Sequence, residues 1–185
     1  MLDSARKHQS TIAPQGGAVD HFSRLGLPRS PTIDGEDLER RYLLKSREVH
    51  PDLNGDDPGS LVASAALNDA FRVLSNPWKR YTYLAELWSQ GVMEANKTLC
   101  PMFLAEALEL FEDVEATETE SSRQELRGRI ERQLSERERD IQCLLQSPAG
   151  AHDAAVKCHE ARYLMRALER LDETTEPVES AQGTF

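Results

Sequence analysis

Apolar residues recur at intervals of three and four along most of this 185-residue chain, the spacing that places side chains on one face of an α-helix. In the first half the spacing predicts four helices: a short one with Phe22, Leu25 and Leu27, one from Asp34 to Val49, one ending at Asn76-Pro77, and one from Pro77 to Gly91. Proline supports two of these boundaries, because it disfavours α geometry in the residue before it and is tolerated in a first turn. The second and third helices are expected to pack antiparallel across a loop at 52–60.

The second half predicts three more helices, at 102–116, 122–146 and 152–173, after a connector at 91–101. Short breaks between helices favour an antiparallel three-helix bundle, and no strand pattern longer than a few residues is visible. The sequence therefore predicts an all-α protein with one helical domain at 19–90 and another at 102–173. The polar ends, residues 1–18 and 174–185, are expected to be disordered tails.

Charge and composition then exclude several classes of function. The formal net charge is −10, and residues 101–185 carry −9 of it, so a nucleic-acid footprint is not expected. No apolar run approaches the roughly 18–20 residues that cross a bilayer, and the first residues do not form a signal peptide. A cytoplasmic protein without membrane contact is predicted. Three dispersed cysteines, Cys100, Cys143 and Cys158, give no metal-binding spacing, so neither a metal nor a cofactor is expected.

Candidate chemistry gathers at His50-Pro51-Asp52, where the second helix meets its loop. The proline forces a turn, which displays His50 and Asp52 at the end of the helix. An imidazole and a carboxylate could form the acid–base pair of an enzyme. No nucleophile, second nearby histidine or phosphate-binding loop accompanies them, however, so an exposed recognition turn is the favoured interpretation and the chain is not expected to be an enzyme.

The run from Asp20 to Leu84 resembles a J-domain, the module that stimulates ATP hydrolysis by DnaK-type chaperones. The resemblance is carried in order by Asp20-His21-Phe22-Ser23-Arg24-Leu25-Gly26-Leu27, Leu38-Glu39-Arg40-Arg41-Tyr42, His50-Pro51-Asp52 and Leu67-Asn68-Asp69-Ala70-Phe71-Arg72-Val73-Leu74. Beyond it, Pro77 to Leu84, Phe103-Leu104-Ala105-Glu106-Ala107-Leu108-Glu109-Leu110 and Arg162-Tyr163-Leu164 are similar in spacing to the HscB (Jac-type) co-chaperones of iron–sulfur cluster assembly.

This resemblance implies an L-shaped protein whose J-domain engages the chaperone ATPase and whose helical bundle holds an IscU-type cluster scaffold protein. His50, Pro51 and Asp52 would act on the ATPase. The basic residues of the preceding helix would dock against an acidic surface of the chaperone; they are Arg40, Arg41, Lys45 and Arg47. The positions expected to bind the scaffold are Leu104, Ala105, Leu108, Glu109, Glu112 and Tyr163.

The helix at 102–116 supports a binding surface independently of the resemblance. Phe103, Ala107, Leu110 and Val114 form one apolar stripe, and a second stripe with Leu104, Leu108 and Phe111 lies beside it. One stripe suffices for a three-helix core, so the second is a candidate partner surface. The alternative is that both stripes are buried between the two domains.

Two departures from the family pattern bear on partner choice. Leu43 and Leu44 stand where J-domains usually carry basic residues, and Lys45 stands where an apolar residue is usual. We expect Lys45 to run along the domain edge and Leu44 to fill the gap. In the bundle, Ala105 replaces a methionine and Phe111 replaces a common arginine. A second hypothesis therefore stays open, in which the chain is a general J-domain adaptor with a different client.

Overall fold

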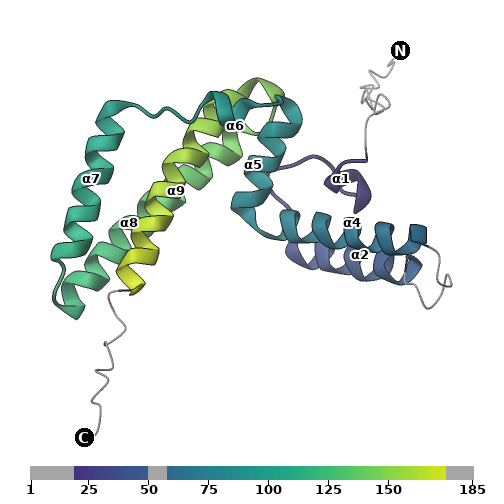
Figure 1. Cartoon of the computed structure of the whole chain (residues 1–185), viewed down its shortest axis with the longest axis horizontal. Coiled ribbons are helices and arrows are strands. Elements are labelled where there is room, and N and C mark those ends of the chain that lie inside the picture. Colours follow the sequence, from purple (N-terminus) through teal and green to yellow (C-terminus); the bar gives the residue numbers. More distant parts are fainter. Residues whose placement is uncertain (1–18, 50–57, 174–185) are drawn as a thin grey trace, which may run out of the picture.

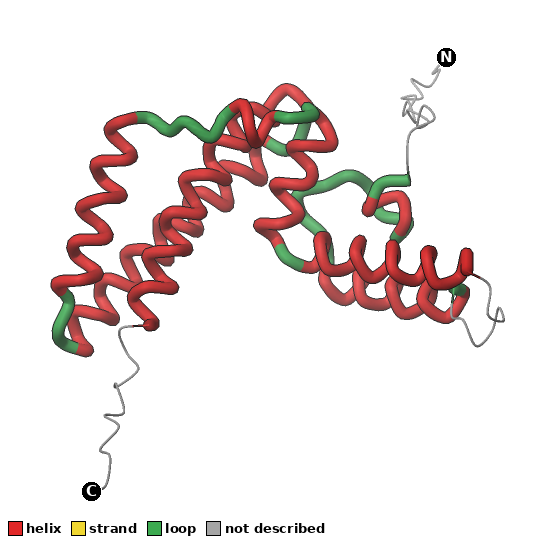
Figure 2. The backbone as a smooth tube through the Cα atoms, viewed as in Figure 1, coloured by secondary structure: helices red, strands yellow, loops and turns green. Residues whose placement is uncertain are grey.

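The computed structural model of the protein describes residues 19–49 and 58–173. Within these ranges the chain is helical, and none of the described residues forms a strand (Figure 2). The helices form two limbs that meet at an angle, one within residues 21–75 and the other within residues 101–173 (Figure 1). The all-α, L-shaped architecture predicted above is therefore confirmed. The predicted tails at 1–18 and 174–185 lie outside the described residues.

The first limb is built on two long helices that lie side by side. They are α2 (Gly35–Glu48) and α4 (Pro58–Ser75), with the short α1 (His21–Arg24) packed against α4. Asp34 caps α2, because its carboxylate accepts hydrogen bonds from the Glu36 and Asp37 amides. The core of this limb comes from side chains spaced along all three helices: Phe22, Leu25, Leu38, Leu67 and Leu74.

The second limb is a three-helix bundle of α7 (Pro101–Ala116), α8 (Glu120–Leu144) and α9 (Ala151–Glu173), with a 3-10 turn at Pro148–Gly150. The predicted bounds of these helices agree to within two residues. Its core is made of aliphatic side chains from all three helices: Leu110, Val114, Leu126, Ile130, Leu164 and Leu171.

The predicted connector at 91–101 is a packed segment. It contains a short helix, α6 (Val92–Ala95), and buries Val92, Met93 and Leu99. His159 of α9 donates a hydrogen bond from Nε2 to the Met93 carbonyl oxygen at 2.8 Å. The connector is therefore packed against α9 through α6.

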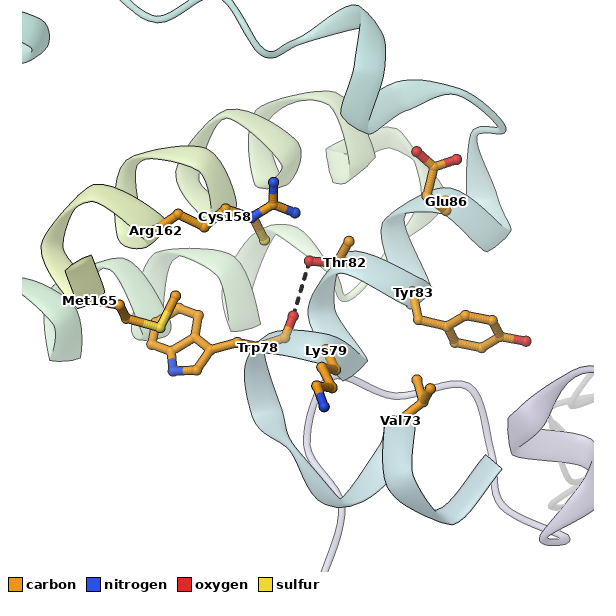
Figure 3. Close-up of a pocket in the computed structure, with 9 residues that line it drawn as sticks. All are labelled: Val73, Trp78, Lys79, Thr82, Tyr83, Glu86, Cys158, Arg162 and Met165. Carbon is orange, nitrogen blue, oxygen red and sulfur yellow. Dashed lines mark hydrogen bonds between the residues drawn. The ribbon is translucent and has the colours of Figure 1, made fainter. Parts of the chain in front are cut away.

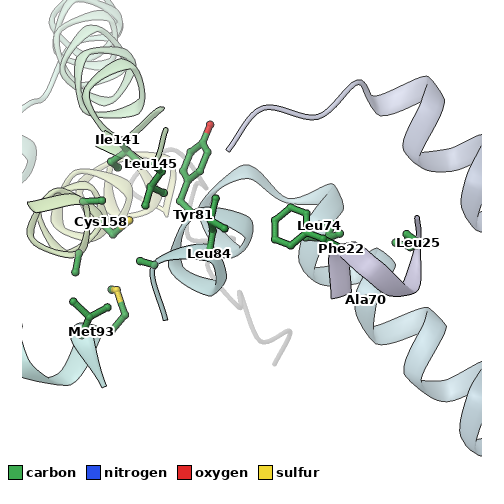
Figure 4. Packing of buried hydrophobic residues seen from close by; sticks show 14 of the residues in the cluster. Phe22, Leu25, Ala70, Leu74, Tyr81, Leu84, Met93, Ile141, Leu145 and Cys158 are labelled. Carbon is green, nitrogen blue, oxygen red and sulfur yellow. The ribbon is translucent and has the colours of Figure 1, made fainter. Parts of the chain in front are cut away.

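Helix α5 (Pro77–Trp88) joins the two limbs, and it ends three residues before the predicted Gly91. Its Tyr81 and Leu84 pack in one cluster with Ile141 of α8 and with Leu145, the residue that caps the end of α8 (Figure 4). The Tyr81 hydroxyl donates to a Glu138 carboxylate oxygen at 2.7 Å and accepts from the Gln142 side chain at 2.8 Å. Residues of the first limb belong to the same cluster, so one continuous core runs through the corner of the molecule.

Candidate functional site

The predicted tripeptide His50-Pro51-Asp52 lies outside the described residues, but both of its flanks are described. Helix α2 ends at Glu48, and the Val49 amide donates to the Lys45 carbonyl oxygen at 3.2 Å. On the other side, the hydroxyl of the buried Ser60 donates to the Val49 carbonyl oxygen at 2.7 Å. The end of α2 and the start of α4 are thus fastened together.

Two aromatic rings determine which face of α2 points outward. Tyr42 stacks on Phe71 of α4 with ring centroids 4.3 Å apart, and its hydroxyl donates to the Asn68 side chain at 2.9 Å. Leu38 is buried on the same side. The outer face of the helix carries a mixture of charged and apolar side chains: Glu36, Glu39, Arg40, Leu43, Leu44 and Arg47.

The four predicted chaperone-docking cations of α2 do not form one uniformly basic surface. Arg40 and Arg41 both pair with Asp37, and the hydrogen bonds from these guanidinium groups lower the pKa of that carboxyl. Arg41 also donates to the Gly26 carbonyl oxygen at 2.6 Å, so it is turned toward the domain edge. The Arg40 and Arg47 side chains are exposed.

The edge beside α2 accommodates Lys45 as expected but not Leu44. Gly26 has a left-handed φ of 68°, and a Cβ at this position would lie 3.3 Å from Arg41 Nη1 and 4.0 Å from Lys45 Cε. The left-handed backbone favours glycine here, and the missing side chain leaves room for the Arg41 guanidinium, while Lys45 Cε lies at an ordinary contact distance. The expectation that Leu44 fills a gap is wrong, because 55% of its surface is exposed.

The two apolar stripes of α7 have different environments. Phe103, Ala107, Leu110 and Val114 are buried, with the Phe103 ring 5.9 Å from Tyr163 of α9 in an edge contact. Leu104 and Leu108 are 40% and 61% exposed. The alternative in which both stripes are buried between the domains is therefore wrong for these two leucines, and the half-buried Phe111 packs against the bundle core.

The six predicted scaffold-binding positions occupy two helices. Five of them are exposed along α7: Leu104, Ala105, Leu108, Glu109 and Glu112. The sixth, Tyr163, is half-buried on α9, where it contacts Phe103. The outer surface of α7 therefore combines apolar side chains with carboxylates. Tyr163 packs against the first turn of α7 through its contact with Phe103.

A pocket of about 440 Å³ that is open to solvent lies where α4 and α5 meet α9 (Figure 3). Trp78, Tyr83 and Met165 form part of its apolar wall, and Lys79 and Arg162 supply cations. Cys158 lines it as a buried side chain, and burial raises the pKa of its thiol to about 11. Sequence patterns gave no sign of this pocket, because its walls come from helices about 80 residues apart.

The described residues also bear on two other classes of site. Among residues 19–49 and 58–173, no group of three His, Cys, Asp or Glu side chains is arranged to hold a metal ion. In the same part of the chain, no helix combines the length and the apolar character required to span a membrane.

Comparison with known families assigns each limb separately. Residues 20–83 match the DnaJ domain, and residues 99–172 match the HSCB C-terminal oligomerisation domain.

Solved structures give the same fold over both limbs. Chaperone HscB from Vibrio cholerae has a TM-score of 0.71 at 21% identity, covering 84% of this chain and 96% of that one. Human co-chaperone protein HscB has a TM-score of 0.74 at 22% identity, covering 89% and 86%.

Two curated relatives match this chain along nearly the whole of their own length. The co-chaperone protein HscB homolog of Vibrio atlanticus (strain LGP32) is 27% identical over 164 residues, which are 83% of this chain and 95% of the relative. The homolog from Azoarcus sp. (strain BH72) is 29% identical over 171 residues, 87% and 96% of the two chains. With a DnaJ domain followed by an HscB C-terminal domain and with these relatives, the chain belongs to the HscB family of J-domain co-chaperones.

Proposed function

We propose that this protein is a cytoplasmic co-chaperone that brings an IscU-type iron–sulfur cluster scaffold protein to a DnaK-type (HscA-type) chaperone. In this proposal His50, Pro51 and Asp52 stimulate the ATPase of the chaperone, and the co-chaperone itself catalyses no reaction and needs no cofactor. The main support is that two exposed surfaces, on α2 and on α7, lie on different limbs that share one core. Such a body can hold two partners at a fixed separation.

The chaperone end of the proposal rests on the geometry of the α2–α4 pair. The Ser60 hydroxyl bond to Val49 fastens the two helix ends that flank the tripeptide. Flanking residues that are already held in place lose less conformational freedom when a partner binds, which favours affinity. We propose that Arg40 and Arg47 face the chaperone, while Arg41 and Lys45 border the contact from the domain edge.

The scaffold end rests on the outer surface of α7. Leu104 and Leu108 expose apolar area beside the carboxylates of Glu109 and Glu112. This combination suits a partner with an apolar patch and neighbouring basic groups. Within this proposal, Ala105 and Tyr163 complete the contact surface.

A single-turnover ATPase assay tests the central step. We expect the wild-type protein to raise the hydrolysis rate of its DnaK-type chaperone and Asp52→Asn to abolish that increase, because the carboxylate is lost. The control is scaffold binding by Asp52→Asn, which should equal that of the wild type, since α7 lies on the other limb. An unchanged rate with wild type, or full stimulation by the variant, would contradict the proposal.

A second candidate function is a general J-domain adaptor with a different client. The observation that favours it is Ala105, which is exposed on α7 where the family pattern has a larger methionine. Calorimetry with purified scaffold protein separates the two candidates. Scaffold binding supports the iron–sulfur role, whereas ATPase stimulation without scaffold binding supports the general adaptor.

A further inference from the structure

The pocket between α4, α5 and α9 has the size and lining of a site for a small molecule. Its volume is about 440 Å³, and its walls include four half-buried side chains, those of Val73, Trp78, Tyr83 and Met165 (Figure 3). Sites for small molecules are typically hollows of about 300–1,000 Å³ lined by apolar and aromatic side chains with a few polar groups. None of the residues that line the pocket belongs to the surfaces proposed for the chaperone or the scaffold.

Lys79 on α5 and Arg162 on α9 are exposed cations that line the pocket. Within residues 19–49 and 58–173, neither side chain forms an ion pair with a carboxylate. Glu86 also lines the pocket, but its carboxylate accepts the Gly91 and Met93 amides at 2.7 and 2.9 Å. That carboxylate is engaged by the turn after α5, which leaves both cations for a ligand.

The Arg162 charge acts on the interior of the pocket. Figure 3 shows its guanidinium group near Cys158 and Thr82. Burial raises the pKa of the Cys158 thiol to about 11, while a hydrogen bond with Thr82 and the Arg162 charge both oppose that rise. Water screens a charge beside an apolar wall less than it screens one on an open surface. An anion held on this wall is therefore attracted by Arg162.

We propose that the pocket binds a small amphipathic carboxylate of the medium-chain fatty acid class. The apolar chain of the ligand lies against Trp78 and Met165, where burial of each methylene adds to affinity. Its carboxylate pairs with Lys79 and Arg162, which selects an anion over a neutral molecule of the same shape. The bound molecule contacts α5 and α9 together, so it stabilises the corner between the two limbs.

The test is a titration of the full chain with octanoate, followed by NMR of its ¹³C-labelled methionine methyl groups. Two of the four methionines are informative. Met165 lines the pocket, whereas Met102 is 70% exposed on α7 and reports binding to that other apolar surface. We expect the Met165 signal, assigned with Met165→Leu, to shift until it saturates while the Met102 signal stays in place. No shift at Met165, or a larger shift at Met102, would overturn the proposed site.

A second titration, with 1-octanol, separates the role of the charge from that of the apolar walls. Lys79→Gln with Arg162→Gln removes both cations from the pocket. The matched control, Arg132→Gln with Arg139→Gln, removes the same charge from exposed positions of α8. Glutamine has nearly the helix propensity of lysine and arginine, so both pairs should fold.

We expect wild type and the control pair to bind octanoate about fivefold or more tightly than octanol. The pocket pair should lose this preference and bind octanol as wild type does, because its apolar walls are unchanged. Equal binding of the two ligands by wild type, or a preference retained by the pocket pair, would overturn recognition of the carboxylate. Weaker octanol binding by the pocket pair would attribute the effect to the walls and overturn it as well.

Discussion

The exposed leucines of α7 give the sharpest quantitative prediction. In the double variant Leu104→Ser with Leu108→Ser, the apolar part of the proposed scaffold surface is removed while the buried stripe, including Phe103 and Leu110, is left in place. We therefore expect scaffold affinity to fall and the helical fold to persist.

The magnitude follows from the exposed fractions. Leu104 is 40% and Leu108 is 61% exposed, so the pair leaves about one whole leucine side chain in water. Complete burial of a leucine contributes about 1.5–3 kcal/mol, which corresponds to a rise in Kd of roughly ten- to a hundredfold. By the same fractions, about one leucine's worth of their surface is covered by the protein itself, so the free energy of unfolding should fall by about 1.5–3 kcal/mol. The slightly lower helix propensity of serine adds less than about 1 kcal/mol.

Isothermal titration calorimetry with purified scaffold protein measures the change in Kd, and far-UV circular dichroism measures helix content. The matched control is Leu61→Ser with Val62→Ser on α4, which changes two side chains that are 62% and 71% exposed on the other limb. We expect the control to retain wild-type affinity.

Two results would refute this reasoning. An unchanged Kd in the α7 variant would mean that the leucines do not contact the scaffold. A marked loss of helix content would mean that Leu104 and Leu108 support the bundle in spite of their exposure. In either case the outer surface of α7 would lose its proposed role.

Three further predictions concern the corner of the molecule and its thiols. Leu145→Ala should lower the free energy of unfolding by about 2–5 kcal/mol in urea denaturation, because the fully buried side chain leaves a cavity. Tyr81→Phe should cost about 1 kcal/mol in the same assay, through loss of its hydroxyl bonds to α8; wild-type stability would contradict a role for these bonds. With Ellman's reagent at pH 8, the exposed Cys100 and Cys143 should react in the native protein. Cys158, buried and with its pKa raised to about 11, should react only on unfolding.

Local signals were sufficient to predict most of the helices. Pro77 follows Asn76, whose side chain accepts the Lys79 amide at 3.0 Å, and this cap marks the start of α5 as the sequence indicates. The end of α5 is less well predicted, because Glu86 accepts the amides of Gly91 and Met93 and so begins a new helix. These two hydrogen bonds depend on the turn between the two helices, and the spacing of apolar residues does not predict that turn.

Long-range packing explains the features that the sequence could not supply. Val92 and Met93 are too few to give a periodic signal, and their burial depends on α9, about 60 residues further along the chain. The pattern on α7 showed two apolar stripes but could not determine which one faces the bundle. Likewise, Arg40 and Arg41 stand at helical spacing from Asp37, yet the turn of Arg41 toward Gly26 required the fold.

The shared core at the corner limits how this J-domain can be exchanged between proteins. A fragment cut after residue 90 would retain Tyr81 and Leu84 but lose Ile141 and Leu145, which cover them. Newly exposed apolar area favours aggregation or partial unfolding of such a fragment. A chimaera that places another J-domain on this bundle would need a compatible α5 surface. A substitution at the α5 side of this contact is therefore expected to be accompanied by a compensating substitution at the α8 side, so that the two limbs change together in evolution.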